Sequence, residues 1–440
     1  MTADTSARLD RRNFFFGVLN GAIFKVIMLL IDSQTVVAWF LMQLGASNVL
    51  IGLVAPIRMG SSFLLQIFVS GYLQQRPYKQ PFYRSMAIVR AVTLLVTAGI
   101  IVWIPLDSPW LILVFFVLLT LYSMGAGLTG LAFVDIVAKA IPPTRRGAFF
   151  AQRSFWGGLL ALAVGPLIGF VLSESAGIRF PVNVAWLFVG AFVTLLAAAG
   201  FWAMIKEPPS EVIRETVGWV EQARRGGQLL RDNVPYRKYL LAQACTILAD
   251  SAGSFYIVYA KEALGITAQM IGVYLTARTA ASIVSNLLWG RISDRRGNRK
   301  LLQINNALGL CMPLIALGIG GLGRGASSAP WLSWAYALVF MASGSYAAAS
   351  LIARTGYLLD VTPPAQRSLY LGFSNTILGV VRFAAMVSGL IADWAGFAVL
   401  MIVSACFYGL ALLLSFAMIE PRASESWQVR AISEEKAPAL

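Results

Sequence analysis

Seven charged residues fall inside long apolar stretches of this sequence. A charge near the centre of a membrane-spanning helix costs about 2.5–3.5 kcal/mol on insertion scales, so each one needs a partner, bound water or a function. Five of the seven are basic and two are acidic, and this excess favours an anionic or carboxylate-bearing ligand. The seven are Lys25, Asp32, Arg58, Arg90, Asp250, Arg278 and Arg382.

Two acid–base pairs have matching depths in these stretches. Asp32 and Arg58 lie equally far from a turn expected near residue 45, each roughly 20 Å along its helix at ~1.5 Å per residue. Asp250 and Arg278 have the same relation to residue 264. The spacing predicts two ion pairs, Asp32–Arg58 and Asp250–Arg278. Each is either a static structural contact or part of a proton or substrate site. An acid beside a fixed arginine normally has a lowered pKa, which favours the structural role.

Three further positions could contact a ligand. Lys25 lies about two helical turns before Asp32 and shares its helix face, and Gln243 holds the matching place in the second half. Lys25 either contacts a ligand, or pairs with an acidic side chain, or extends its ammonium group toward water. Arg90 is predicted to reach the membrane interface, whereas Arg382 lies deeper.

The elements that carry these residues are predicted from composition and run length. The chain is 58% hydrophobic and 12% charged, more apolar than a water-soluble surface of 440 residues allows. Its continuous apolar runs predict helices, since barrel strands would alternate. The chain is therefore expected to be an all-α membrane protein. The twelve predicted spans are 14–41, 48–74, 85–105, 109–137, 148–173, 183–205, 238–263, 268–291, 300–322, 331–358, 366–392 and 396–418.

Basic residues outside the spans are distributed unequally. All but Arg179, Lys261 and Arg324 fall in loops on one side. The positive-inside rule then puts both termini in the cytoplasm of a multi-pass protein of the inner or plasma membrane. The same loops account for the net charge of +15 without a nucleic-acid partner.

The predicted domains are an N-terminal six-helix bundle (1–205), a cytoplasmic linker (206–237), a C-terminal six-helix bundle (238–420) and a cytoplasmic tail (421–440). The linker contains apolar residues that could form a helix on the membrane surface. A plain solvated linker is the alternative.

Short matches about 220 residues apart recur in the same order in both halves. They indicate a parallel repeat of six helices, an arrangement suited to alternating access around a central site. The matches pair Leu44-Gly45 with Leu264-Gly265, Ile51-Gly52 with Ile271-Gly272, Arg58 with Arg278, Asp32-Ser33 with Asp250-Ser251, Pro142-Pro143 with Pro363-Pro364, Arg146 with Arg367, and Met204, Ile205, Glu207 and Pro208 with Met418, Ile419, Glu420 and Pro421.

The loop after the eighth span, residues 290–300, reads GRISDRRGNRK and resembles the signature loop of the major facilitator superfamily. Its first-half counterpart begins at Gly71 and has Gln75 where the acid belongs. The resemblance covers residues 12–420. It implies two six-helix bundles, with helices one, four, seven and ten around a cavity that Lys25 would face.

The resemblance also implies that Asp294 helps to lock a cytoplasmic gate. An aspartate can accept hydrogen bonds from a helix N-terminus or an arginine, while Gly290 allows close helix approach and Gly297 a tight turn. The alternative is an ordinary basic loop. The predicted gate-loop residues are Gly290, Asp294, Arg295, Gly297 and Arg299.

Small residues in helices four and ten, including Gly127 and Gly344, are interpreted as packing positions. Gly165-Pro166 and Gly169 in helix five partly match a motif associated with antiporters in that superfamily, or else mark an ordinary kink.

The sequence contains no histidine and no phosphate-binding G-x-x-x-x-G-K-[ST] motif. We therefore expect no cofactor, no metal site and no enzyme activity. The favoured function is secondary transport of a small organic solute, with an anion as the favoured solute and protons as a candidate coupling ion. The alternatives are a lipophilic drug efflux antiporter, a channel or receptor, and a membrane-embedded enzyme using Asp135 or Asp360, which are better interpreted as gate-loop partners. A monomer suffices, because one chain contains both halves.

Overall fold

The computed structural model describes residues 3–420, except for 65–68, 70–71, 74, 143–144, 210–218, 326–329, 363–366 and 385. The loop start at Gly71, residues 210–218 of the linker and the tail 421–440 lie outside the described residues. The helices are α1 (Ala3–Leu30), α2 (Val36–Gln43), α3 (Asn48–Leu64), α5 (Gln80–Trp103), α6 (Pro109–Ala140), α7 (Arg146–Leu172), η2 (Glu174–Ala176), α8 (Val182–Ala203), α9 (Trp219–Asp232), α10 (Val234–Asp250), η3 (Ser251–Ser254), α11 (Phe255–Leu264), α12 (Gln269–Gly325), α13 (Pro330–Ala335), α14 (Ala337–Val361), α15 (Arg367–Ala384) and α16 (Val387–Phe416).

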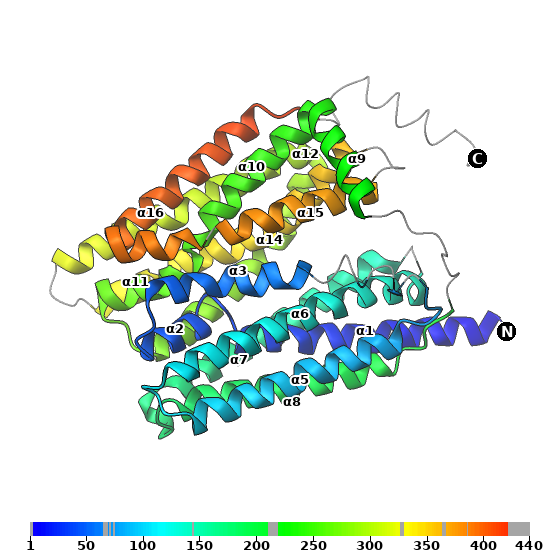
Figure 1. The fold of residues 1–440 in the computed structure, drawn as a ribbon. Helices are drawn as coiled ribbons and strands as arrows, with labels where there is room; N and C mark the ends of the chain where they lie inside the picture. Colours follow the sequence, from blue (N-terminus) through cyan, green and yellow to red (C-terminus); the bar gives the residue numbers. More distant parts are fainter. Residues whose placement is uncertain are drawn as a thin grey trace.

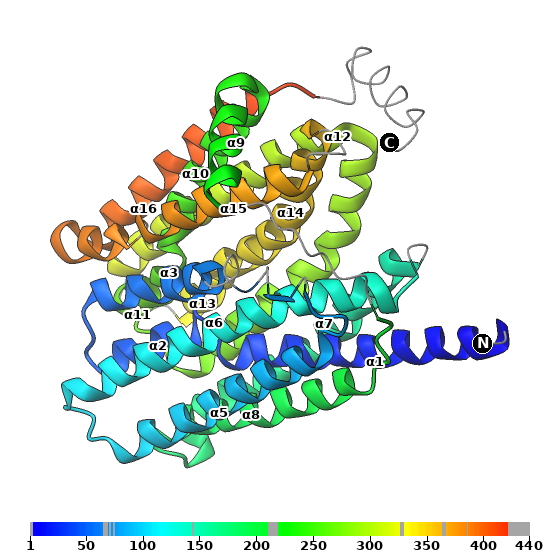
Figure 2. The same ribbon diagram turned by 45° about the vertical axis from the view of Figure 1, so that its right-hand side comes forward.

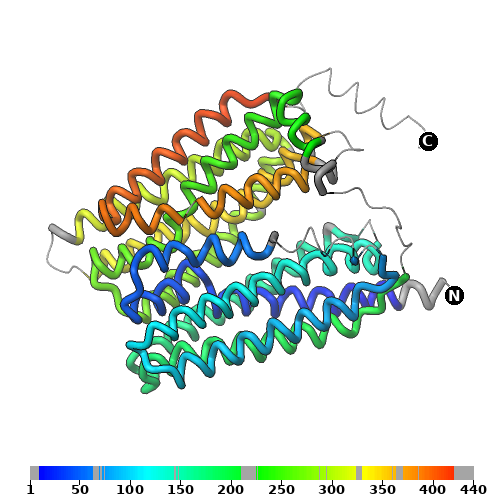
Figure 3. The backbone as a smooth tube through the Cα atoms, in the orientation of Figure 1, coloured from blue at the N-terminus to red at the C-terminus, as the bar shows by residue number. Residues whose placement is uncertain are grey.

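These helices form two bundles that lie side by side (Figures 1 and 2). The first contains α1, α5, α6, α7 and α8, and the second contains α10, α12, α14, α15 and α16. Helix α3 packs on α6 and also against α15 and α16. In both views the bundles converge where α2 and α11 lie, here called the closed end. They diverge toward the N-terminus and α9, here called the open end. Figure 3 shows that the chain completes one bundle before it builds the other.

Nine helical stretches among the described residues are long and apolar enough to cross a membrane. One of them, Tyr370–Phe416, covers two predicted spans, and α12 runs through two others. Large apolar side chains cover the outside of the bundles; Trp103 is 87% exposed and Trp394 89%. Such a surface suits lipid. The chain is therefore a multi-pass α-helical membrane protein, and the count of twelve helices stays a prediction.

The first helix of each half is broken at the repeated Asp-Ser dipeptide. Helix α1 ends just before Asp32, and α2 starts four residues after it, at Val36. Helix α10 ends at Asp250 and passes through the 3₁₀ turn η3 into α11. A carboxylate at such a break can satisfy backbone donors that a continuous helix would have paired.

Repeated glycines end these broken helices. Gly45 and Gly265 both have positive φ, 70° and 62°, and terminate α2 and α11 as left-handed caps. Gly297 (φ 79°) bends α12 between two spans, as the sequence predicted for that turn.

Glycine pairs join the two halves at the closed end. A Cβ added at Gly389 of α16 would lie 2.5 Å from Cα of Val49 in α3, and one added at Gly52 would lie 3.1 Å from the backbone nitrogen of Gly389. A Cβ at Gly272 of α12 would lie 2.7 Å from Cα of Gly169 in α7. The two contacts correspond under the repeat, since 272 − 52 and 389 − 169 both equal 220. Only glycine allows these backbones to come so close.

Candidate functional site

A cavity of about 530 Å³ lies between the two halves. Five of its lining residues come from the first half: Ser33 and Gln34 at the helix break, and Ala55, Pro56 and Met59 of α3. The others come from helices between α10 and α16. None of the described residues of α6 lines it, contrary to the expectation for helix four. The described lining of this cavity therefore comes mainly from the second half.

The cavity is positively charged. Its charged lining residues are Asp250, Arg278, Arg354 and Arg382, three cations to one anion among the described lining residues. Ion pairs with Asp32 and Asp250 offset two of these arginines. Cationic side chains thus outnumber anionic ones in the described lining, which suits an anionic ligand.

Asp250 is the centre of a cluster of cavity-lining side chains. Its Oδ1 accepts hydrogen bonds from the hydroxyls of Tyr408 (2.5 Å) and Tyr346 (2.7 Å). Its Oδ2 accepts one from Nη2 of Arg354 at 3.3 Å, and the same nitrogen donates to the Tyr346 hydroxyl at 3.0 Å. Nε of Arg354 is buried and has no hydrogen-bond partner among the described residues. The cluster thus presents an arginine with spare donor capacity beside the cavity.

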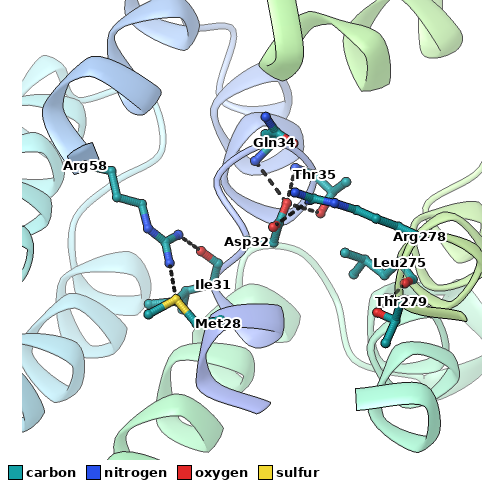
Figure 4. A network of polar contacts seen from close by, with 9 residues as sticks. All are labelled: Met28, Ile31, Asp32, Gln34, Thr35, Arg58, Leu275, Arg278 and Thr279. Atoms are coloured by element: carbon teal, nitrogen blue, oxygen red, sulfur yellow. Dashed lines mark hydrogen bonds and ion pairs between the residues drawn. The ribbon is translucent and has the colours of Figure 1, made fainter. Parts of the chain in front are cut away.

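Asp32 makes a different set of contacts (Figure 4). Its Oδ1 accepts from the backbone nitrogens of Gln34 and Thr35, each at 3.0 Å, and from the Thr35 hydroxyl at 2.9 Å. These bonds cap the break before α2. Its Oδ2 accepts from Nη1 of Arg278 at 3.0 Å, and this ion pair joins the first half to the second.

Both ion pairs predicted from helix depth are wrong. Asp32 pairs with Arg278, and Asp250 with Arg354. Arg58 instead donates to the carbonyl of Ile31 and approaches the sulfur of Met28 (Figure 4). Equal depth did not determine the pairing because it leaves each helix free to rotate about its axis.

The other charged positions also differ in their surroundings. Lys25 is exposed, lies against Gly157 of α7 and does not line this cavity. Gln243 and Arg382 do line it; Gln243 is buried, and its Oε1 has no hydrogen-bond partner among the described residues. The prediction that Arg90 reaches the interface is wrong. It is 2% exposed and donates to the side chains of Thr129 and Tyr122.

Sequence reasoning missed Arg354. It was counted among the basic residues of the loops, although it lies inside the predicted span 331–358. Its position within that span was the available signal. Arg153 was missed in the same way; its guanidinium lies over the rings of Phe133 and Phe149 and donates to Oδ1 of Asn20 at 3.1 Å.

The gate loop folds back on the last helix of its half. The backbone nitrogen of Arg299 donates to Oε2 of Glu420 at 3.1 Å, and the Glu420 carboxylate occupies the space beside Gly297. Asn298 donates to Oδ2 of Asp360 at 2.7 Å, so Asp360 contacts the loop through an amide, whereas the expected partner was an arginine.

Two other gate-loop residues, Arg295 and Gly290, do not add to this contact among the described residues. Arg295 is exposed. A Cβ at Gly290 would meet nothing within 4 Å, so the predicted close helix approach there is absent. The side chain of Asp294 lies outside the described part of the structure.

The first half has the matching contact. Glu207 accepts from the backbone nitrogens of Lys79 (2.9 Å) and Gln80 (2.7 Å) at the start of α5, and it pairs with Lys139 at 2.5 Å. Burial and, secondarily, the charge of Lys139 lower the pKa of Lys79. The repeated Glu-Pro dipeptides therefore mark two carboxylates that each bind the N-terminus of the third helix of their half.

Glycines of helices four and ten have packing roles, as predicted. A Cβ at Gly127 would collide with the carbonyl of Ser62 in α3, and one at Gly344 with the carbonyl of Arg278 in α12. Gly165 and Gly169 of the partial antiporter motif lie against Gly272, which gives them a packing role at the junction of the halves.

Solved transporter structures share this fold. The chain resembles a variant of the nucleoside transporter NupG (TM-score 0.68, 13% identity, 93% of this chain and 98% of that one). It similarly resembles a D-xylose-proton symporter (TM-score 0.68, 14% identity, 96% and 100%) and a bacterial homologue of the iron transporter ferroportin (TM-score 0.65, 12% identity, 95% and 99%). At these identities the likeness concerns the fold alone.

The curated sequence relatives match a smaller share of the chain than the solved structures do. Uncharacterized proteins of Mycobacterium tuberculosis and Mycobacterium bovis are 20% identical over 258 residues, 58% of this chain and 48% of theirs. The chain spans about half the length of these curated relatives. Residues 239–440 match the family model described as Major Facilitator Superfamily.

The paired bundles and the cavity between them define a polytopic helical membrane protein that has the fold of solved transporters. The second half of the chain is thus similar to the Major Facilitator Superfamily, a family of transporters.

Proposed function

We propose that this chain is a secondary active transporter that moves a small organic anion across the membrane by alternating access. The observation that carries the proposal is the cavity between the halves, with its three arginines and one aspartate. A fixed excess of positive charge in a low-dielectric cavity attracts anions and repels cations.

The arrangement of the halves supports the mechanism. Broken helices that meet at a central cavity are typical of transporters whose two bundles rock around a fixed site. Here the bundles converge at one end, where glycine pairs hold them, and diverge at the other (Figures 1 and 2). In this proposal the open end is cytoplasmic, both termini are cytoplasmic and the membrane is the inner or plasma membrane, because the basic loops lie on that side.

The sequence-based domain boundaries stay part of the proposal: bundles at 1–205 and 238–420, a linker at 206–237 and a tail at 421–440. A single chain supplies both halves of the cavity, so a monomer is the proposed working unit. Among the site residues, Gln243, Arg278 and Arg382 are proposed to contact the substrate, because each lines the cavity, and Asp250 of the same lining is proposed as a coupling residue that does not bind the anion. Asp32 and Arg58 are proposed to have structural roles, and Lys25 to contribute charge from outside the cavity lining.

The second candidate is efflux of a lipophilic drug. The cavity also has apolar lining residues, including Met59, Met312 and Leu378, which could bind such a compound. Its predicted substrates are cations or neutral molecules, so the two candidates make opposite predictions about charge.

A thermal-shift screen of the purified protein against organic anions, organic cations and neutral drugs tests the proposal. A ligand at 100 times its Kd that binds only the folded state should add about 2.7 kcal/mol of stability. We expect shifts from anions that weaken in Arg382→Gln, with Arg179→Gln, an exposed residue outside the cavity lining, as the matched control. Hits confined to cations and neutral drugs would favour the second candidate.

A further inference from the structure

The two aspartates that the repeat places at equivalent positions have different surroundings. Asp32 and Asp250 each lie at the break in the first helix of their half. In a symmetric transporter they would share one role. Their contacts show that the two halves have diverged, and the divergence indicates which acid can change its charge during transport.

Asp32 is held by structural contacts. Three of its four hydrogen bonds come from Gln34 and Thr35, two of them from backbone nitrogens. The fourth comes from Arg278. Protonation of Asp32 would weaken both the cap of the break before α2 and the ion pair with Arg278 that joins the halves. Its side chain is 15% exposed.

Among the described residues, the hydrogen-bond partners of the Asp250 carboxylate are all side chains that line the cavity: Tyr346, Tyr408 and Arg354. Its side chain is 33% exposed. A carboxylate with phenolic partners can bind a proton without losing a backbone contact, because a hydroxyl can accept a hydrogen bond as well as donate one.

The contact between Asp250 and Arg354 is loose. Their 3.3 Å separation exceeds the roughly 2.7–2.9 Å that is usual for charge-assisted hydrogen bonds. Nε of Arg354 is buried without a hydrogen-bond partner among the described residues. A planar carboxylate or phosphate could use Nε and a terminal nitrogen of the guanidinium together, a bidentate geometry that Asp250 does not achieve here.

We propose that Asp250 is the proton-carrying group of this transporter, and that the anionic group of the substrate replaces it on Arg354. This inference rests on the proposed function. The incoming anion would place a second negative charge beside Asp250, and two neighbouring carboxylates do not both stay ionised. Asp250 therefore takes one proton from water as one monoanion binds. Both leave on the other side, so the coupled step moves one proton and one anion and is electroneutral.

Other groups around Asp250 fit this exchange. Arg382 of α15 and Arg278 of α12 line the same cavity, Tyr408 comes from α16, Tyr346 and Arg354 from α14, and Tyr256 from α11. Among the described lining residues, Asp250 is the one that carries a carboxylate. The arginines stay charged at all relevant pH values, so proton exchange at the cavity is left to Asp250.

Proton uptake on anion binding tests the inference directly. Purified protein in weakly buffered detergent solution is mixed with sodium benzoate, and a pH-sensitive dye reports protons taken up; disodium succinate, a dianion, and inorganic phosphate, itself a buffer near neutral pH, serve for the binding readout alone. We expect about one proton per bound monoanion in the wild type and in Asp32→Asn, and none in Asp250→Asn. Binding itself is followed by thermal shift in the same samples.

Transport supplies the second readout. Liposomes that contain the protein are loaded with unlabelled benzoate, and exchange of labelled benzoate is compared with accumulation driven by a pH gradient. Both are counted as the excess over protein-free liposomes, because neutral benzoic acid also crosses lipid. We expect Asp250→Asn to retain exchange and lose accumulation, whereas Asp32→Asn keeps both in whatever fraction folds. Tyr408→Phe, which keeps the carboxylate, should keep coupling.

The outcomes separate the two claims. Anion binding without proton uptake in the wild type, or gradient-driven accumulation by Asp250→Asn equal to that of the wild type, would overturn the assignment of Asp250 and leave the transporter proposal standing. No binding or exchange of any of the three anions by the wild type would overturn the proposed function and the inference with it.

Discussion

Asp32 of the first half and Arg278 of the second form an ion pair of 3.0 Å that joins the two bundles. The same Asp32 caps the break between α1 and α2. One carboxylate therefore connects the local conformation of a broken helix to the relative position of the halves. A bundle that rocks away from its partner must break this pair.

We predict that Arg278→Gln shifts the protein away from the conformation described here. Hydrogen bonds to charged groups contribute about 1.5–3 kcal/mol, so the balance of conformations should change roughly 10- to 150-fold. Spin labels at the exposed residues Arg179 and Lys261, one from each half and both lining a second cavity, would report a longer distance. The labels need a background in which Cys245, Cys311 and Cys406 are replaced. An unchanged distance distribution would show that the pair does not hold the closed end.

Gly272→Ala should have a similar effect by a steric route. Its methyl group would meet backbone atoms of Gly165 and Gly169, which cannot yield without separating α7 from α12. Overpacking of this kind costs about 1–3 kcal/mol. The same pair of spin labels reports the change. Gly99→Ala is the control, since its Cβ would meet nothing within 4 Å; equal effects of the two substitutions would refute a specific role for the glycine contact.

Glu207→Gln is expected to lower the melting temperature. The carboxylate is 2% exposed, binds two backbone nitrogens at the start of α5 and pairs with Lys139. Loss of its charge should cost about 1–3 kcal/mol, because Lys139 loses its partner in a partly buried site. Thermal unfolding in detergent measures this, with exposed Glu174→Gln at the closed end as the control. A double substitution with Lys139→Gln should lose less than the sum of the single losses; strict additivity would argue against the pair.

Arg382→Gln should weaken anion binding more than Lys25→Gln does. Arg382 lines the cavity, whereas Lys25 lies against Gly157 outside its lining. A lost charge-assisted contact of about 1.5–3 kcal/mol corresponds to a roughly 10- to 150-fold higher Kd. Titration of benzoate by thermal shift gives both values. A larger loss in Lys25→Gln would place the binding site in the first half.

The sequence predicted features that follow from local chemistry and from the repeat. Apolar run length indicated the membrane helices, because lipid leaves few alternatives. The repeated Asp-Ser, Leu-Gly and Glu-Pro dipeptides, which the sequence indicated only as a repeat, proved to be helix breaks, left-handed caps and carboxylates that bind helix N-termini; the breaks at Asp32 and Asp250 were not predicted, since both were assigned to continuous spans. Each is a local backbone event that a short motif can encode.

The ion pairs could not be predicted from the sequence. The residue number determines how deep a side chain lies along its helix. Which neighbour that side chain faces depends on the orientation of the helix about its own axis and on which bundle lies opposite. Asp32 faces the other half, so its partner lies 246 residues away. Arg354 was assigned to a loop because it lies near the end of its predicted span, and basic residues at the ends of spans were counted with the loops. The sequence does not indicate that the second half supplies most of the cavity lining, because both halves carry the same motifs.

The most direct measurement is uptake of a labelled organic anion, benzoate, into liposomes that contain the purified protein, beside a labelled lipophilic cation and empty liposomes. We expect saturable benzoate uptake that unlabelled anions inhibit and that Arg382→Gln reduces, with no uptake of the cation. Saturable uptake of the cation, with benzoate uptake equal to that of empty liposomes, would refute transport of an organic anion.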